Sequence, residues 1–123
     1  MESDLRVIPT RLHGAIDYLV SVLVLALPFM AGEQDGPRWL FVTVGCAGII
    51  YSLITDYEWG VVRLLPVPWH LALDVVFGVA MLALGIFLWL SLLGVISAVV
   101  GIAALILAAI TELRPRTARP TAS

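Results

Sequence analysis

The nine residues Pro-Val-Pro-Trp-His-Leu-Ala-Leu-Asp at positions 66–74 decide how this chain is organised. They end a short polar loop and open a long apolar segment, and they place His70 and Asp74 four residues apart on one face of the predicted helix. The same spacing occurs once before, because His13 and Asp17 stand 57 residues upstream. The chain is therefore predicted to be a duplicated helical hairpin in which both copies keep a histidine–aspartate pair.

The duplication extends along both helices of each predicted hairpin. Residues 9–30 align without gaps with residues 66–87, and residues 44–56 align with residues 100–112 at an offset of 56. Histidine and aspartate are rare within apolar spans, so their recurrence carries more weight than matches between apolar residues. The identical residues of the first alignment are, in the first copy, Pro9, His13, Ala15, Asp17, Val22, Leu25, Ala26 and Leu27.

Composition indicates that the solvent for most of this chain is lipid. Of its 123 residues, 61% are hydrophobic and only 13% are charged, which is too little charge to cover a soluble domain of this size. The net charge of −2 gives no indication of nucleic-acid binding. The length is that of one domain. We therefore expect a single domain embedded in a lipid bilayer.

The domain is predicted to contain four membrane-spanning helices. Polar turns follow the first and second predicted helices, and a long uncharged stretch needs a tight hairpin near residues 89–94 to divide it. We predict an all-α, four-transmembrane-helix bundle built from two tandem hairpin repeats with pseudo-two-fold symmetry. The predicted helices are about 11–31, 37–55, 68–90 and 93–112; repeat 1 is about 9–60, repeat 2 is about 66–114, and a disordered tail is about 115–123.

Basic residues predict the orientation of the bundle. Arg38 is alone on one side of the predicted spans, and the other side carries Arg6, Arg11, Arg63, Arg114, Arg116 and Arg119. The positive-inside rule then places both termini in the cytoplasm, and we expect a bacterial inner membrane protein. Trp59 and Trp69 fall at the cytoplasmic interface and Trp39 and Trp89 at the opposite one, as in an aromatic belt.

Small residues indicate where helices approach closely. Gly48 and Ser52 have the small-x-x-x-small spacing, and Ala104 and Ala108 keep it in the second copy. We expect the helices over 37–55 and 93–112 to meet near the pseudo-two-fold axis along these faces. Ser21 and Gly78, one turn beyond the aspartates, predict a close contact between the other two helices.

The arrangement of two-span repeats resembles the SPW-repeat family, whose first helix carries Ser-Pro-Trp. The corresponding positions here are Leu27-Pro28-Phe29 in the first copy and Leu84-Gly85-Ile86 in the second. The resemblance covers about residues 9–112 and implies a small integral membrane protein. It implies no site, because the family has no defined biochemical role.

Polar residues gather at the predicted cytoplasmic end. His13, Asp17, His70 and Asp74 are the candidate ligands of a metal ion, because two imidazoles and two carboxylates suit Zn²⁺ or another first-row divalent ion. A supporting polar layer is predicted to consist of Thr55, Asp56, Tyr57, Glu58, Thr111 and Glu112.

Four interpretations of this layer stay open at the sequence level. It ties the helix ends together as a structural or interaction module, it binds a divalent metal, it conducts protons or cations, or His13 and His70 ligate a b-type haem. The sequence carries no nucleophile or phosphate-loop motif of an enzyme. Four short helices enclose little volume, so we also expect a homo-oligomer.

Overall fold

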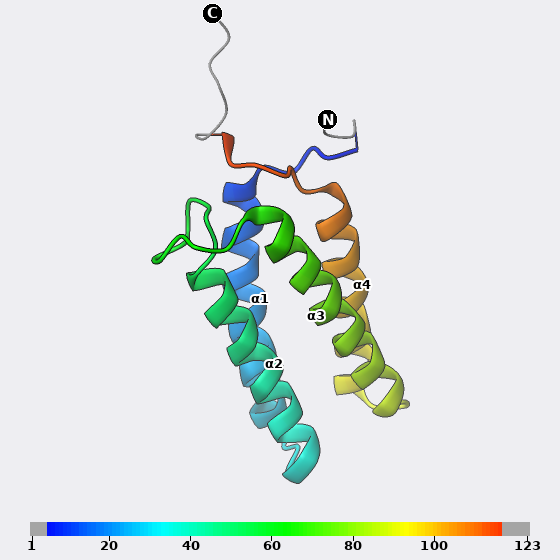
Figure 1. The fold of residues 1–123 in the computed structure, drawn as a ribbon. Coiled ribbons are helices and arrows are strands. Elements are labelled where there is room, and N and C mark those ends of the chain that lie inside the picture. The colour runs from blue at the N-terminus through cyan, green and yellow to red at the C-terminus, as the bar shows by residue number, and fades with distance from the viewer. Residues whose placement is uncertain (1–4, 117–123) are drawn as a thin grey trace, which may run out of the picture.

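The computed structural model describes residues 5–116 and consists of four α-helices packed as a bundle (Figure 1). The helices are α1 (Thr10–Met30), α2 (Asp35–Leu53), α3 (Val67–Phe87) and α4 (Leu92–Ile110). This confirms the all-α prediction, including the division of the uncharged stretch between α3 and α4. Of the tail predicted to be disordered, residues 117–123 lie outside the described part of the chain.

Prolines and one serine set the starts of three helices. Pro9 and Pro66 occupy matching positions immediately before α1 and α3, and both have extended backbone. Proline suits this position because its φ is fixed and it has no amide hydrogen to donate to a helical hydrogen bond. Ser91 caps α4, because its Oγ accepts a hydrogen bond from the Gly94 amide at 3.0 Å. Leu90, in the turn before it, has a φ of 70°, so the α3–α4 turn depends on a non-glycine residue in the left-handed region.

Within residues 5–116, three helices are long and apolar enough to cross a membrane, namely α1, α3 and α4. Helix α2 has the same length as α4, 19 residues, but its first four residues include Asp35 and Arg38. Large apolar side chains cover the outside of the bundle; Leu19 and Val76, for example, are 72% and 65% exposed. An outer surface of this kind is expected for a protein whose surroundings are lipid.

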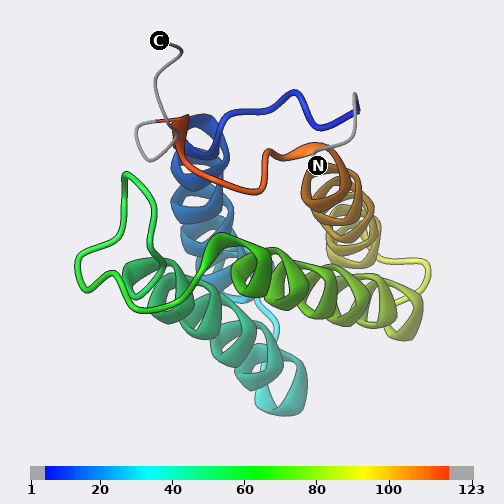
Figure 2. The same cartoon turned by 45° about the horizontal axis from the view of Figure 1, so that its top comes forward.

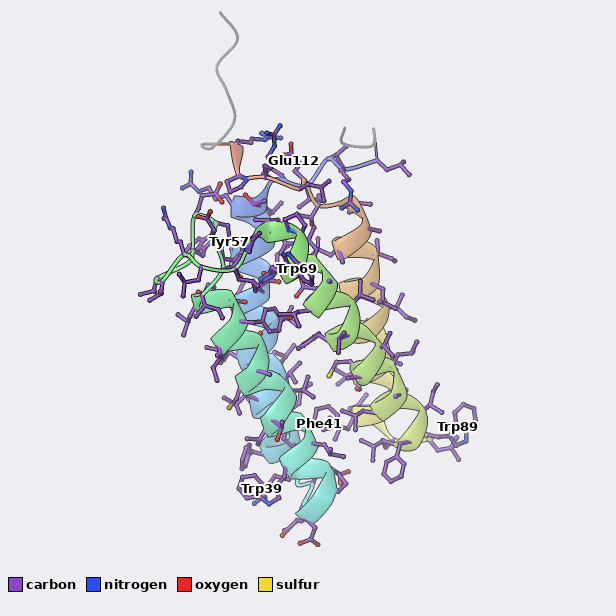
Figure 3. The ribbon with its side chains drawn as sticks, in the orientation of Figure 1. Trp39, Phe41, Tyr57, Trp69, Trp89 and Glu112 are labelled. Carbon is purple, nitrogen blue, oxygen red and sulfur yellow. The ribbon has the colours of Figure 1, made fainter. Side chains whose placement is uncertain are left out.

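The tryptophans lie toward the two ends of the bundle, as predicted. Trp39 and Trp89 are at the end opposite the termini, and Trp69 is near the end that holds them (Figure 3). Trp59 joins Trp69 there, since its indole Nε1 donates to the Arg11 carbonyl oxygen at 2.7 Å.

The closest helix contacts lie within each hairpin. A Cβ atom added to Gly45 of α2 would stand 2.8 Å from the Leu25 amide nitrogen of α1, and one added to Gly101 of α4 would stand 2.6 Å from the Gly78 carbonyl oxygen of α3. The predicted close contact of α2 with α4 was therefore wrong, and Ser21 and Gly78 face α2 and α4 rather than each other. Small residues predicted the close approach but not the partner helix.

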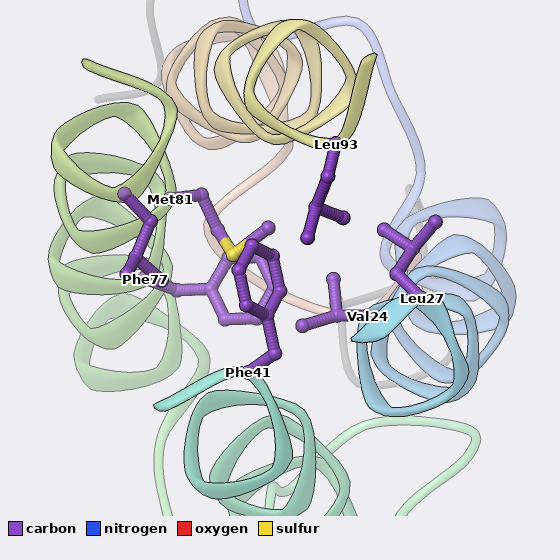
Figure 4. Close-up of a cluster of buried hydrophobic side chains, with 7 residues drawn as sticks. Val24, Leu27, Phe41, Phe77, Met81 and Leu93 are labelled. Atoms are coloured by element: carbon purple, nitrogen blue, oxygen red, sulfur yellow. The ribbon is translucent and has the colours of Figure 1, made fainter. Parts of the chain in front are cut away.

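An apolar core joins the two hairpins in the half of the bundle away from the termini. Side chains from all four helices meet there (Figure 4); the buried members are Val24, Leu27, Phe41, Phe77, Met81, Leu84 and Leu93. At about 25 cal/mol per Å², burying one such side chain stabilises a fold by about 1.5–3 kcal/mol relative to exposing it to water. In lipid surroundings that term would be weaker, and close packing would contribute more to the docking of the hairpins.

Two matching backbone contacts fasten the other end, beside the termini. The amides of Val7 and Ile8 donate to the Ile110 carbonyl oxygen, and those of Leu64 and Leu65 donate to the Ile54 carbonyl oxygen. Figure 2 shows the first of these contacts, where the N-terminal segment runs beside the segment after α4. The contacts fix the chain immediately before Thr55 and Thr111, the two threonines that follow α2 and α4.

Candidate metal centre

The four predicted ligands converge on one point inside the bundle. His13 and Asp17 project from α1, and His70 and Asp74 project from α3, so that one ligand atom of each lies within 4.8 Å of all the others. Both histidines are buried, with 2% and 1% exposed, and the aspartates are nearly so. The prediction that these four residues belong to one cluster is confirmed.

The shortest contacts in the cluster cross between the two hairpins. The His13 Nε2 atom lies 2.6 Å from Asp74 Oδ2, and the His70 Nε2 atom lies 2.8 Å from Asp17 Oδ2. Contacts within each helix are longer, at 3.0 Å for the first pair and 3.2 Å for the second. Each imidazole therefore faces both carboxylates.

Two buried threonines hold the other nitrogen of each ring. The His70 Nδ1 atom lies 2.7 Å from Thr55 Oγ1, and the His13 Nδ1 atom lies 2.7 Å from Thr111 Oγ1. Each threonine belongs to the hairpin that does not contain its histidine. Both hairpins are thus needed to orient either ring.

The threonines also fix where the ring protons are. Thr55 Oγ1 donates to the Tyr51 carbonyl oxygen at 2.5 Å, and Thr111 Oγ1 donates to the Leu107 carbonyl oxygen at 2.6 Å. A hydroxyl has one hydrogen, so each threonine oxygen is left to accept from the imidazole. Each Nδ1 atom therefore carries a proton, and each Nε2 atom is the one turned to the carboxylates.

Two tyrosines donate to the same carboxylates. The Tyr51 hydroxyl donates to Asp74 Oδ1 at 2.5 Å, and the Tyr57 hydroxyl donates to Asp17 Oδ2 at 3.2 Å. Burial, together with the charge of Asp17, raises the pKa of the Tyr57 phenol well above its ordinary value, so this hydroxyl keeps its proton and remains a donor. Tyr57 was predicted in the supporting layer and Tyr51 was missed. The sequence feature that could have identified Tyr51 is its position one turn before Thr55, on the same helical face.

Three predicted members of the supporting layer do not reach the cluster. Asp56 is exposed, Glu58 accepts a hydrogen bond from Thr10 Oγ1 at 2.7 Å, and Glu112 pairs with Arg116 at 2.9 Å. Figure 3 labels Glu112 at the end of the bundle, beyond the helices. Of the five carboxylates expected in one layer, only those of Asp17 and Asp74 contact the histidines. Thr55, Thr111 and Tyr57 are the predicted supporting residues that do contact the cluster.

The geometry argues against the haem alternative. The ring centroids of His13 and His70 are 5.5 Å apart, but both Nε2 atoms are in contact with carboxylate oxygens. Asp17 and Asp74 therefore occupy the space through which the porphyrin plane would have to pass between two axial ligands.

A cavity of about 150 Å³ adjoins the cluster. At its polar end it is lined by His13, Asp17, Tyr51 and Asp74, and elsewhere by Ser21 and by apolar side chains of α1, α3 and α4. Residues exposed on the outside of the bundle contribute to its wall, so the cavity opens toward the surroundings of the helices.

No family model, no curated protein and no solved structure matches this chain. The resemblance to SPW repeats therefore stays a prediction, and the chemistry of the cluster has to carry the functional argument.

Proposed function

We propose that this chain is a small integral membrane protein that binds one divalent transition-metal ion, Zn²⁺ in the first place, through His13, Asp17, His70 and Asp74. The observation that carries the proposal is that two Nε2 atoms and two carboxylates converge while both Nδ1 atoms donate to anchored threonines. Ligating histidines in metalloproteins characteristically donate their other nitrogen to a fixed acceptor, which sets the tautomer and the ring orientation.

Charge balance supports a divalent ion. Without a metal, the Nε2 atoms of His13 and His70 lie 2.6 and 2.8 Å from carboxylate oxygens, so each contact needs a proton, and a proton held on the nitrogen makes the imidazole a cation. Two imidazolium groups and two carboxylates sum to zero. Two neutral imidazoles, two carboxylates and one divalent ion also sum to zero, so one ion replaces two protons without leaving a net charge in a buried site.

The donor distances support a small ion. Tetrahedral Zn²⁺ with bonds of about 2.0–2.2 Å holds neighbouring donor atoms about 3.3 Å apart. The four nitrogen–oxygen contacts of the cluster span 2.6 to 3.2 Å, so these pairs have to separate by only a few tenths of an ångström on average. The remaining pairs of donor atoms lie within 4.8 Å of one another and have to close around the ion. Two nitrogen and two oxygen donors suit Zn²⁺ better than the all-oxygen shells of Mg²⁺ or Ca²⁺.

We further propose that all four helices span the membrane as two pseudo-symmetric hairpins with both termini in the cytoplasm. The matched backbone contacts at the ends of α2 and α4 support the symmetry. The described arginines support the orientation, because Arg38 alone lies at the end away from the termini. The metal site would then lie near the cytoplasmic face.

The test is elemental analysis of protein purified in detergent without a polyhistidine tag, followed by titration with Zn²⁺ and with Co²⁺ as a visible probe of tetrahedral geometry. We expect one ion per chain. Asp17→Asn and Asp74→Asn should each weaken Zn²⁺ binding by more than the roughly 10–100-fold that loss of an outer partner costs. Asp56→Asn is the matched control, because it makes the same change on an exposed side chain and should leave affinity unchanged.

A protein that contains no metal and takes up neither ion would overturn the proposal. The cluster would then be a hydrogen-bonded link that ties α1 to α3, and the aspartate variants would lower stability with no binding to lose.

A further inference from the structure

The two hairpins differ at the position one turn before each threonine. In the first hairpin the Tyr51 hydroxyl donates to Asp74 Oδ1, one turn before Thr55. The matching position of the second hairpin, one turn before Thr111, is Leu107, which has no hydroxyl. Asp74 therefore receives a phenol from α2. Asp17 accepts from Tyr57 through Oδ2 but receives no phenol from the equivalent place on α4.

The cavity lies where that second phenol ring is missing. Both Leu107 and Asp17 line it, together with Phe77 on the side of α3. Its volume of about 150 Å³ is the size of an apolar protein cavity that admits a benzene ring. The space thus suits one six-membered ring.

The polar end of the cavity offers an acceptor for a hydroxyl group. Asp17 Oδ1 has His13 Nε2, at 3.0 Å, as its hydrogen-bond partner among the described residues. A carboxylate oxygen accepts two hydrogen bonds. Asp74 Oδ1, the equivalent atom, already receives the Tyr51 phenol.

We infer that this cavity binds the phenol-type ring of a lipid-soluble molecule, such as an alkylphenol or a quinol head group. The ring would fill the space beside Leu107, and its hydroxyl would donate to Asp17 as Tyr51 donates to Asp74. Val99 and Ala103 line the cavity and are also exposed on the outer face of α4, so the ligand enters from the lipid side. The site requires the folded cluster but not a bound metal ion.

The experiment measures binding of 4-fluorophenol and of fluorobenzene to the full chain in lipid nanodiscs by fluorine NMR. The two probes have nearly the same size and differ in the hydroxyl. We expect saturable binding of 4-fluorophenol that unlabelled phenol displaces, and at least tenfold weaker binding of fluorobenzene, because a hydrogen bond to a buried carboxylate is worth a factor of ten or more.

Variants separate this site from simple partitioning into lipid. Leu107→Phe fills the cavity and should abolish saturable binding, as should Ala103→Phe at its mouth, which serves if the first variant folds poorly. Ile106→Phe is the matched control, because Ile106 is exposed on the same helix and does not line the cavity.

Three results would overturn the inference: no saturable binding of 4-fluorophenol, equal binding of both probes, or binding that survives Leu107→Phe and Ala103→Phe. Equal binding would indicate an apolar cavity that takes lipid chains. Zinc content measured on the same variants keeps the two proposals separate, since Leu107→Phe leaves all four metal ligands in place.

Discussion

Replacing Thr55 with valine tests whether the threonines orient the cluster. The change keeps the shape of the side chain and removes one oxygen, which accepts from His70 Nδ1 at 2.7 Å and donates to the Tyr51 carbonyl at 2.5 Å. His70 is 1% exposed, so water cannot take the place of the lost acceptor. Leaving a buried donor without a partner costs about 1–3 kcal/mol.

We therefore expect Thr55→Val to lower the free energy of unfolding by about 2 kcal/mol, which is about a 30-fold change in the ratio of folded to unfolded protein. Thr111→Val should cost the same, because His13 Nδ1 lies at the same distance from its oxygen. Each variant should also weaken Zn²⁺ binding by about 10–100-fold, since it removes an outer partner of a ligating histidine.

The assay is reversible unfolding in mixed micelles at fixed detergent composition, with Zn²⁺ affinity measured by competition with a chelator. Thr43→Val is the control, because Thr43 is exposed on the outside of α2. The reasoning is refuted if Thr55→Val costs no more than Thr43→Val, or if it costs about 2 kcal/mol while Thr111→Val costs nothing. The second result would mean that the two rings are not held in equivalent ways.

Three further predictions follow from the geometry. Zinc binding should release two protons per ion, measured with a pH indicator in weak buffer, and release of none would contradict the charge balance proposed for the cluster. Gly101→Val should separate α3 from α4 and lower stability by more than 2 kcal/mol in the same unfolding assay, because even a Cβ there would be 2.6 Å from the Gly78 carbonyl oxygen; Gly36→Ala, with open space around it, should change stability little. Tyr51→Phe should weaken Zn²⁺ binding at least tenfold, whereas Tyr18→Phe, whose hydroxyl donates to the Trp59 carbonyl, should not.

Much of the fold could be predicted because membrane helices are specified locally. Apolar runs of about 20 residues, bounded by prolines and polar turns, predict four helices, and the observed boundaries lie within three residues of those predicted. The four-residue spacing of each His–Asp pair places both side chains on one helical face. Repetition of the pair then predicted that the faces meet, and the cluster confirms it.

Which helices contact each other could not be predicted from small residues. Gly48 and Ser52 indicate that a neighbour approaches α2 closely, but lipid is as apolar as any helix and gives no preference among partners. In the structure, that neighbour is α1. The short α1–α2 connection, residues 31–34, favours antiparallel packing of these two helices, and this constraint outweighed the small-residue match between α2 and α4.

The sequence by itself determined an all-helical chain, its apolar surface and the four residues of the cluster, because helix periodicity and hydropathy act over a few turns. Only the tertiary structure decided that His13 meets Asp74 and Thr111, that Tyr51 completes the cluster, and that a cavity stands beside Leu107. Those pairings depend on how far the two hairpins rotate and slide when their cores dock, and no local pattern encodes that distance. A shift of one helical turn, about 5.4 Å, would keep every predicted helix and remove the site.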